Sequence, residues 1–477
     1  MFNKAQSNLL YILLFIAFQK YSFNSVKLIS ILYMIKSVSI NLHYAYLINS
    51  FILVINSIAS LIGGFLGDYL LRNYYVCILG SIIMVLGNIL LISIESSLGF
   101  VIGLSLLAIG DGLIKPNVAS LLVISHNSIP NSNLNQSFNL YYIAINLGVF
   151  ISAISCSALT SYKNIFCFYT STIASLCIIV FLLVKKSSFY NPTLYSRFCQ
   201  QHNSFIIKRL FLLIFLTICL LWLFSIKPGL SFLCMILCVC IAFLSNIKKA
   251  NLKIFNTLLL LTPIILFYAC YEQGASSINI FIDTNVNKKI SIFSEITIPT
   301  ITFQALDPLM SIIIGSLIHY HFYDKKNDND FLSIKIGIGF CSISMGFIFL
   351  LLFSTEVTDD TLTSIWVIPC VYLFLVLGEL LIVPTMMAAL TKLFPPNMMT
   401  TSMGVYYLFV ALGQLLSGII ASRSIPNTLT INIVPEKLDY YKEYYSIAII
   451  AGLVGIIFIL LCKRTDKILL YANKHTN

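Results

Sequence analysis

The most regular feature of the chain is a series of apolar runs of about 20 residues, separated by short polar segments. A helix of this length crosses the hydrocarbon core of a bilayer, because each residue adds about 1.5 Å along the helix axis. The runs are continuous rather than alternating, which excludes a transmembrane barrel. They predict fourteen membrane-spanning helices, at 9–33, 47–71, 75–94, 100–123, 137–159, 165–184, 206–226, 229–245, 254–282, 298–320, 334–353, 362–393, 401–421 and 444–461.

Composition and charge support an all-α membrane protein. Of the 477 residues, 58% are hydrophobic and only 10% are charged, whereas a soluble domain has about 25% charged residues. If the amino terminus is cytoplasmic, 18 lysines and arginines lie in inside segments and 8 lie in outside segments. This asymmetry follows the positive-inside rule and predicts that both termini are cytoplasmic. The net charge of +11 therefore does not indicate a nucleic-acid partner.

Two basic segments divide the chain into parts. The segment 185–209 follows six runs, and the segment 248–253 precedes another six, with two runs between them. We therefore expect an N-terminal six-helix bundle at 1–184, a linker with two extra transmembrane helices at 185–253, and a C-terminal six-helix bundle at 254–477.

Charged residues lie inside the apolar runs, and five of them divide by sign between the two halves. Lys20, Lys27 and Lys115 belong to the first half, and Glu272 and Glu379 belong to the second half. A charge at mid-bilayer costs at least about 2.5–3.5 kcal/mol, so such residues are kept where they pair or line a water-filled path. A pair 4 Å apart at an effective dielectric near 20 is worth about 4 kcal/mol. The pattern predicts opposite charges that meet between two halves, as in a transporter with a central binding site.

Several short motifs give the chain a family resemblance. They are GGFLGD at 63–68, GDGLIKPNV at 110–118, FNLYYIAINLG at 138–148, YEQGASS at 271–277, FQ at 303–304 with DP at 307–308, and GEL at 378–380 with Pro384 and MG at 403–404. In this order they resemble the proton-dependent oligopeptide transporter (POT/PTR) family of the major facilitator superfamily. Bacterial members of that family also carry two extra helices between their halves.

The resemblance implies a fold and a function. The fold is that of the major facilitator superfamily, with two six-helix bundles plus two inserted helices. The function is secondary active import of di- and tripeptides by proton symport through alternating access, in a bacterial inner membrane. Lys115 and Glu379 would form a cytoplasmic-side gate pair, and Lys27 and Glu272 an extracellular-side pair.

The resemblance also implies site residues. The substrate-binding set is Lys27, Asn146, Tyr268, Glu272, Asp307, Glu379 and Tyr406, with the two tyrosines at positions where the family usually has tryptophan. The set for proton coupling and gating is Lys20, Lys27, Asp111, Lys115, Glu272 and Glu379. For Asp68, a supporting role in a cytoplasmic turn and in helix packing is expected rather than contact with substrate.

The first helix departs from the family pattern of an acid, two variable residues, a second acid and arginine. The aligned positions are Ile16, Gln19 and Lys20, so both acids that couple transport to protons are missing. Asp111 lies four residues before Lys115, on the same helix face. We hypothesise that Asp111 neutralises Lys115 in place of these acids. Asp307 stands where the family has asparagine and adds a carboxylate near the expected peptide amino terminus.

Other functions stay open at this stage. The chain could move another small solute, such as an anion or a metabolite, act as an uncoupled facilitator, or be a membrane receptor that does not transport. The sequence has no G-x-x-x-x-G-K-[ST] run and no histidine or cysteine cluster with metal-ligand spacing. We expect no enzyme activity, no cofactor or metal, and a proton gradient as the energy source. The expected partners are short peptides, protons and the lipid bilayer, with no nucleic acid and no obligate protein partner.

Overall fold

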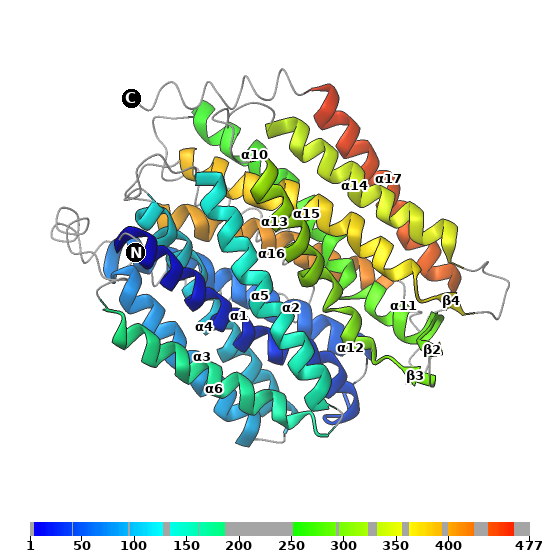
Figure 1. Cartoon of the computed structure of the whole chain (residues 1–477), viewed down its shortest axis with the longest axis horizontal. Coiled ribbons are helices and arrows are strands. Elements are labelled where there is room, and N and C mark those ends of the chain that lie inside the picture. Colours follow the sequence, from blue (N-terminus) through cyan, green and yellow to red (C-terminus); the bar gives the residue numbers. More distant parts are fainter. Residues whose placement is uncertain are drawn as a thin grey trace.

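The computed structural model describes residues 4–40, 42–93, 96–126, 134–160, 162–186, 251–291, 295–322, 332–354, 362–393, 399–423 and 437–461. These residues form two groups of helices, which Figure 1 shows as a blue-to-cyan half beside a green-to-red half. The first half contains α1 (Lys4–Lys36), α2 (Leu42–Phe65), the π-helical turn η1 (Leu66–Leu70), α3 (Asn73–Ser93), α4 (Ser97–His126), α5 (Leu134–Thr160) and α6 (Ile165–Val184). The second half contains α10 (Asn251–Tyr271), the 3₁₀ turn η2 (Glu272–Gly274), α11 (Ser277–Asn285), α12 (Thr300–Phe303), α13 (Leu306–Phe322), α14 (Leu332–Phe353), α15 (Val367–Leu393), α16 (Met399–Arg423) and α17 (Lys437–Leu460).

Eleven helices in the described part of the chain are long and apolar enough to cross a membrane. Their outer faces carry large apolar side chains that are exposed, among them Leu86 at 52%, Ile173 at 61%, Val180 at 60% and Leu453 at 56%. A soluble protein rarely exposes so much apolar surface, whereas a bilayer covers it. The predicted spans at 206–226 and 229–245, and most of the predicted linker at 185–253, lie outside the described residues.

Two predicted spans contain a break in the helix, which corrects the continuous helices expected from the sequence, although residues 300–318 still count as one of the eleven spans. The run at 254–282 is divided into α10 and α11 by the turn that contains Glu272, and the run at 298–320 is divided into α12 and α13. Ser276 Oγ donates to the Glu272 carbonyl at 2.9 Å, and Ser277 Oγ donates to Gln273 Oε1 at 2.8 Å. A break at membrane depth is tolerated because such hydroxyls satisfy the polar groups that it exposes.

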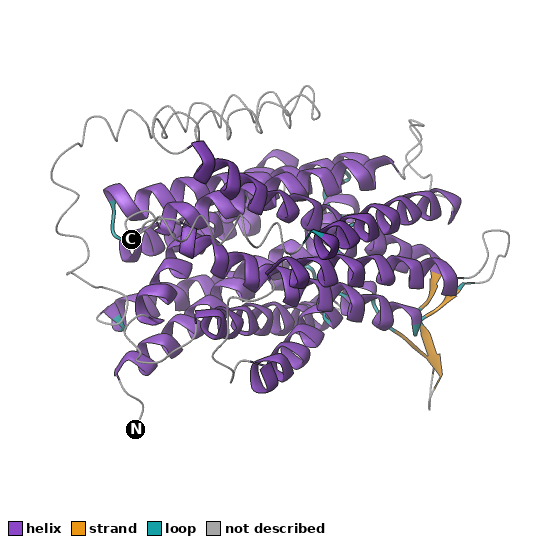
Figure 2. Ribbon diagram, turned by 90° about the horizontal axis from the view of Figure 1, so that it is seen from above, coloured by secondary structure: helices purple, strands orange, loops and turns teal. Residues whose placement is uncertain are grey.

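Four short strands lie together at one end of the molecule. β1 (Val286–Asn287) pairs in parallel with β4 (Thr363–Ser364), and β2 (Lys289–Ser291) pairs antiparallel with β3 (Glu295–Thr297). Figure 2 shows the strands beyond the helices at this end, which we call the strand end. Strands β1 to β3 follow α11 and precede α12, and β4 lies between α14 and α15, so the strands mark the end toward which η2 and α11 lead.

The two halves contact each other through α2 against α16 and through α5 against α13. Glycines allow the first of these contacts. A Cβ atom added at Gly64 would lie 2.6 Å from the Thr400 carbonyl oxygen, and one added at Gly404 would lie 2.9 Å from Leu61 Cα. Small residues at helix crossings let backbones approach closely in membrane proteins.

Candidate substrate cavity between the two halves

A cavity of about 480 Å³ lies between the halves. This volume is within the usual range for small-molecule sites. Its lining includes the sequence-predicted residues Lys20, Lys27, Lys115, Asn146, Tyr268, Glu272, Asp307, Glu379 and Tyr406. Of the predicted site residues, only Asp111 is absent from the lining, because it is buried directly behind the wall with 0% exposure.

Charges of opposite sign face this cavity from the two halves. The cations Lys20, Lys27 and Lys115 come from α1 and α4. The acids are Glu272 from η2, Asp283 from α11, Asp307 from α13 and Glu379 from α15. The expectation that each half supplies one sign at the seam therefore agrees with the structure.

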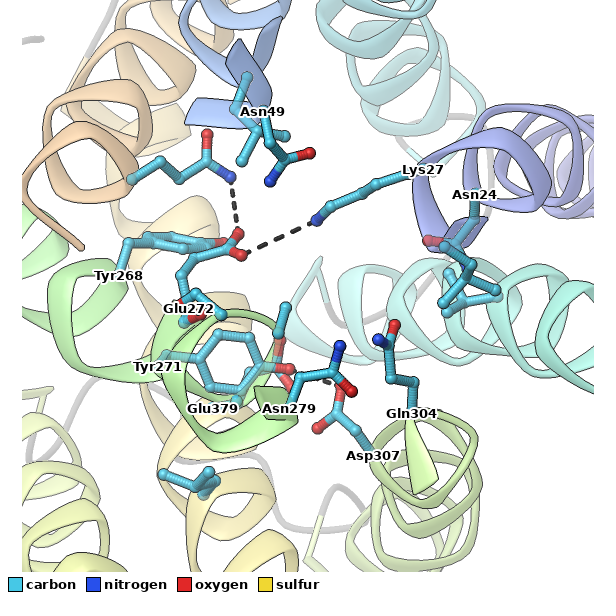
Figure 3. A pocket seen from close by; sticks show the side chains of 18 of the residues that line it. Asn24, Lys27, Asn49, Tyr268, Tyr271, Glu272, Asn279, Gln304, Asp307 and Glu379 are labelled. Atoms are coloured by element: carbon cyan, nitrogen blue, oxygen red, sulfur yellow. Dashed lines mark hydrogen bonds and ion pairs between the residues drawn. The ribbon is translucent and has the colours of Figure 1, made fainter. Parts of the chain in front are cut away.

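Lys27 and Glu272 form the ion pair that was expected across the cavity. The Lys27 Nζ atom lies 3.8 Å from Glu272 Oε2, and Gln414 Nε2 donates to Glu272 Oε1 at 2.7 Å. Figure 3 shows Lys27 extended from α1 toward Glu272. The contact between Lys27 and Glu272 is long, so a small movement of either half breaks it.

The expected pair between Lys115 and Glu379 is not formed. Lys115 Nζ instead lies 2.8 Å from Asp111 Oδ2, on the same helix. A partner four residues away on one helix is reached without crossing the cavity, which explains the difference. The ammonium group also lies 5.5 Å from the Phe23 ring centroid and 5.6 Å from that of Tyr407, which belongs to the other half.

Asp111 is the centre of a buried polar network. Its carboxylate accepts hydrogen bonds from Gln19 Nε2 at 2.5 Å and Asn56 Nδ2 at 2.8 Å, and Lys20 Nζ lies 3.4 Å away. Lys115 also donates to Asn56 Oδ1. The carboxylate on α4 thus contacts the two first-helix positions where the resemblance places an acid and an arginine. Two lysines share one aspartate, so the network has one more basic side chain than it has acids.

The acids of the second half are arranged around Tyr271. The Tyr271 hydroxyl donates to Asp307 Oδ2 at 2.7 Å. Glu379 is 5% exposed and lies beside Tyr142 and Tyr271. The second oxygens of both acids, Asp307 Oδ1 and Glu379 Oε2, are buried and have no hydrogen-bond partner. They are therefore acceptors for a ligand that brings donors.

Asn146, Tyr268 and Tyr406 lie on the cavity wall as expected. The Tyr406 hydroxyl is buried without a partner, and Asn146 Nδ2 donates to the Tyr142 carbonyl at 3.1 Å. The sequence analysis did not identify several other polar residues of the wall or of the network behind it, among them Asn56, Tyr142, Tyr271, Asn279 and Gln414. A signal was present for Asn56 and Gln414, because a lone amide inside an apolar run needs a partner.

Asp68 joins the two halves at the end of the molecule opposite the strand end. It accepts hydrogen bonds from the Thr400 backbone N–H at 3.3 Å, and from the N–H and the hydroxyl of Thr401 at 2.7 Å each. These groups are the first turn of α16, where a negative charge is favoured. The cavity reaches Asp283 and Thr300 at the strand end. Asp68 is not in its lining, in agreement with a packing role rather than substrate contact.

Residues 74–433, most of the chain, match the model of the POT family (PTR2). The chain belongs to the POT family. It is therefore an integral membrane transporter rather than an enzyme. Its fold is that of the major facilitator superfamily.

Known POT relatives are similar along most of their length. The chain is 26% identical over 424 residues to dipeptide and tripeptide permease A of Enterobacter sp. (strain 638). The alignment covers 87% of this chain and 83% of that protein. It is 28% identical over 409 residues to dipeptide and tripeptide permease B of Salmonella typhimurium (strain LT2), which covers 81% and 80%.

Solved POT structures have the same fold. A peptide transporter POT in complex with sulfate superposes with a TM-score of 0.79 at 19% identity, over 97% of this chain and 95% of that one. A POT family transporter in complex with a thioalcohol-conjugated peptide gives a TM-score of 0.79 at 18% identity, over 96% of each chain.

Proposed function

We propose that this POT family member imports di- and tripeptides together with protons across a bacterial inner membrane, with both termini in the cytoplasm. The observation that carries the proposal is the cavity between the halves, which has lysines on one wall and acids on the other. A peptide in water has a carboxylate at one end and an ammonium group at the other, so the cavity is complementary to both ends. The permeases that the chain resembles are named for dipeptides and tripeptides.

The charge arrangement supports one orientation of the peptide. Among the acids that the structure describes, Lys20 and Lys115 pair with Asp111 alone, so the network can attract the peptide carboxylate. The unpaired oxygens of Asp307 and Glu379 can accept from the peptide ammonium group. Asn146, Tyr268 and Tyr406 also line the cavity and can supply amide and aromatic contacts.

In the proposed cycle, the cavity is open toward the strand end while Asp68 and α16 close the other end. The predicted orientation makes the strand end extracellular. A proton that reaches Glu272 removes its attraction for Lys27, which lies 3.8 Å away. The peptide then draws the two walls together, and the bond between Asp68 and Thr401 breaks as the cytoplasmic end opens.

A second candidate follows from the excess of basic side chains around Asp111. A small anion would bind Lys20 and Lys115 without needing the acids of the other half. The missing first-helix acids also favour an uncoupled facilitator. A receptor that binds peptide without moving it is a further alternative.

Reconstitution separates these functions. The purified protein is placed in proteoliposomes that contain a pH-sensitive dye, and Ala-Ala or a small anion such as sulfate is added outside. Acidification with Ala-Ala supports proton-coupled import, whereas counterflow of labelled peptide without acidification supports facilitated diffusion. Anion uptake without peptide uptake, or peptide binding without any flux, would exclude the proposed function.

A further inference from the structure

The charges of the cavity are not balanced evenly. Lys27 pairs with Glu272, and both Lys20 and Lys115 pair with Asp111. Asp307 and Glu379 form no ion pair with any residue that the structure describes. The amino-end wall of the proposed peptide site thus carries two acids, of which a single ammonium group neutralises one.

The same wall offers acceptors that have no donors. Asn279 Oδ1 from α11, Asp307 Oδ1 from α13 and Glu379 Oε2 from α15 are buried, unpartnered and on the cavity lining. Figure 3 shows these three side chains near Tyr271. A substrate ammonium group has three hydrogen-bond donors and no acceptor, so it can donate to these three unpartnered oxygens.

Other charged or titratable groups act on these acids. Lys27 and Glu272 are the charged neighbours of Asp307, which also accepts a hydrogen bond from Tyr271. Glu272 also acts on Glu379, which Tyr142 and Tyr271 contact. Lys27 is already engaged by Glu272, and the tyrosine hydroxyls bring no charge. Asp307 and Glu379 face the same part of the cavity (Figure 3), so a second positive charge between them is favoured.

We propose that Asn279, Asp307 and Glu379 form a site for two positive charges, which selects peptides with a second cationic group near the amino end. This inference rests on the proposed peptide transport and extends it to a substrate class. A peptide without charged side chains brings one ammonium group, and a proton bound to one of the two acids supplies the second positive charge. A peptide with an amino-terminal lysine brings both charges itself, so it is imported with one proton fewer than Ala-Ala.

Peptide isomers test the site. We would measure the equilibrium dissociation constants of the dipeptides Lys-Ala, Ala-Lys and Ala-Ala for the full chain in lipid nanodiscs. Lys-Ala and Ala-Lys have the same composition and differ only in the position of the lysine. We expect Lys-Ala to bind about tenfold more tightly than Ala-Ala, since a charge-assisted hydrogen bond is worth at least a factor of that size. Ala-Lys lacks the second charge at the amino end and should bind like Ala-Ala.

Three variants identify the residues responsible. Asp307→Asn should reduce the ratio of Lys-Ala to Ala-Ala affinity to about one, whereas Asp307→Glu keeps the charge and should retain the preference. Asp283→Asn is the matched control, because Asp283 is an acid at the rim of the cavity that pairs with Lys288 at 2.8 Å. The control should keep the wild-type ratio, and thermal unfolding of each variant shows that it is folded.

The outcomes distinguish this inference from the function on which it rests. If no peptide binds, both the proposed function and the inference are overturned. If all three peptides bind equally, or if Asp307→Asn keeps the preference for Lys-Ala, the inference alone is overturned. Dye-loaded proteoliposomes add an independent measurement, because acidification per imported Lys-Ala should be smaller than per imported Ala-Ala.

Discussion

Asp111 is a completely buried carboxylate on which two lysines of the cavity depend. Lys20 and Lys115 have side chains that are 12% and 15% exposed, so neither has much contact with water. Gln19 and Asn56 donate to the same carboxylate and fix its position. Loss of its charge would leave two buried cations without a counter-charge.

We therefore expect Asp111→Asn to lower the free energy of unfolding by about 3–5 kcal/mol, the usual cost of removing one partner of a buried ion pair. Peptide uptake should also be lost. Thermal unfolding in detergent and uptake in proteoliposomes measure the two effects. Unchanged stability and uptake would refute the idea that Asp111 replaces the missing first-helix acids.

A second substitution tests whether position or charge is what matters at this site. Gln19 contacts Asp111 and stands at a position where the family resemblance places an acid. In the Asp111→Asn background, Gln19→Glu should restore part of the stability, because it returns a carboxylate to the same network within reach of the lysines. Gln414→Glu, on the opposite wall, is the matched control and should not restore it.

The sequence predicted the charged residues of the site better than their partners. Lys27 and Glu272 were expected to pair across the halves, and they do. Lys115 was assigned both a distant partner, Glu379, and a local one, Asp111, and the structure contains only the local pair. Spacing along one helix determines a local contact, whereas a contact between halves depends on how far the cavity is open, which no sequence pattern reports.

At the scale of elements, the contact between α2, η1 and α16 controls one end of the molecule. Asp68 accepts from the first turn of α16, and hydrogen bonds to a charged group are worth about 1.5–3 kcal/mol. Asp68→Ala should therefore open this end more often. Spin labels at Tyr75→Cys and Lys335→Cys, at the beginnings of α3 and α14, should report a longer distance population.

The control for this measurement is an acid at the other end. Asp283→Ala removes the pair with Lys288 and should leave the distance between the same labels unchanged. If both variants, or neither, shift the distance, Asp68 is not the specific latch of this end.

The glycine contact between α2 and α16 gives a second prediction at this scale. Gly64→Ala places a Cβ atom 2.6 Å from the Thr400 carbonyl oxygen, so the helices must separate at a cost of about 1–3 kcal/mol. Thermal stability should fall. Gly315→Ala, where the nearest atom would lie 3.4 Å away, is the matched control and should be tolerated.

Most helices could be predicted from apolar runs, but the breaks within two of them could not. Hydropathy averages over about 19 residues and does not detect a turn of three residues such as η2. Glycine and two serines after Glu272 were visible in the sequence, and Pro308 lies in the first turn of α13, where its missing N–H is harmless. These residues indicate a break only once Glu272 is known to face a cavity.

At the scale of the whole molecule, transport requires the two halves to move as units. The hydrogen bond between Asn73 Nδ2 and Thr400 Oγ1, 3.3 Å long, joins the halves at the end that Asp68 closes. Ser344 Oγ donates to the Ala448 carbonyl at 2.7 Å, but both residues belong to the second half. A covalent link at the first pair therefore opposes the movement, whereas a link at the second pair does not.

In a background without the native cysteines, an Asn73→Cys/Thr400→Cys disulfide should stop peptide uptake, because the cytoplasmic end can no longer open. Peptide binding from the strand end should persist, since the cavity reaches that end in the closed arrangement, and a reductant should restore uptake. A Ser344→Cys/Ala448→Cys disulfide should leave uptake intact. Equal uptake by both oxidised variants would show that the halves do not separate at Thr400, and loss of binding in the first variant would show that substrate enters from the end that Asp68 closes.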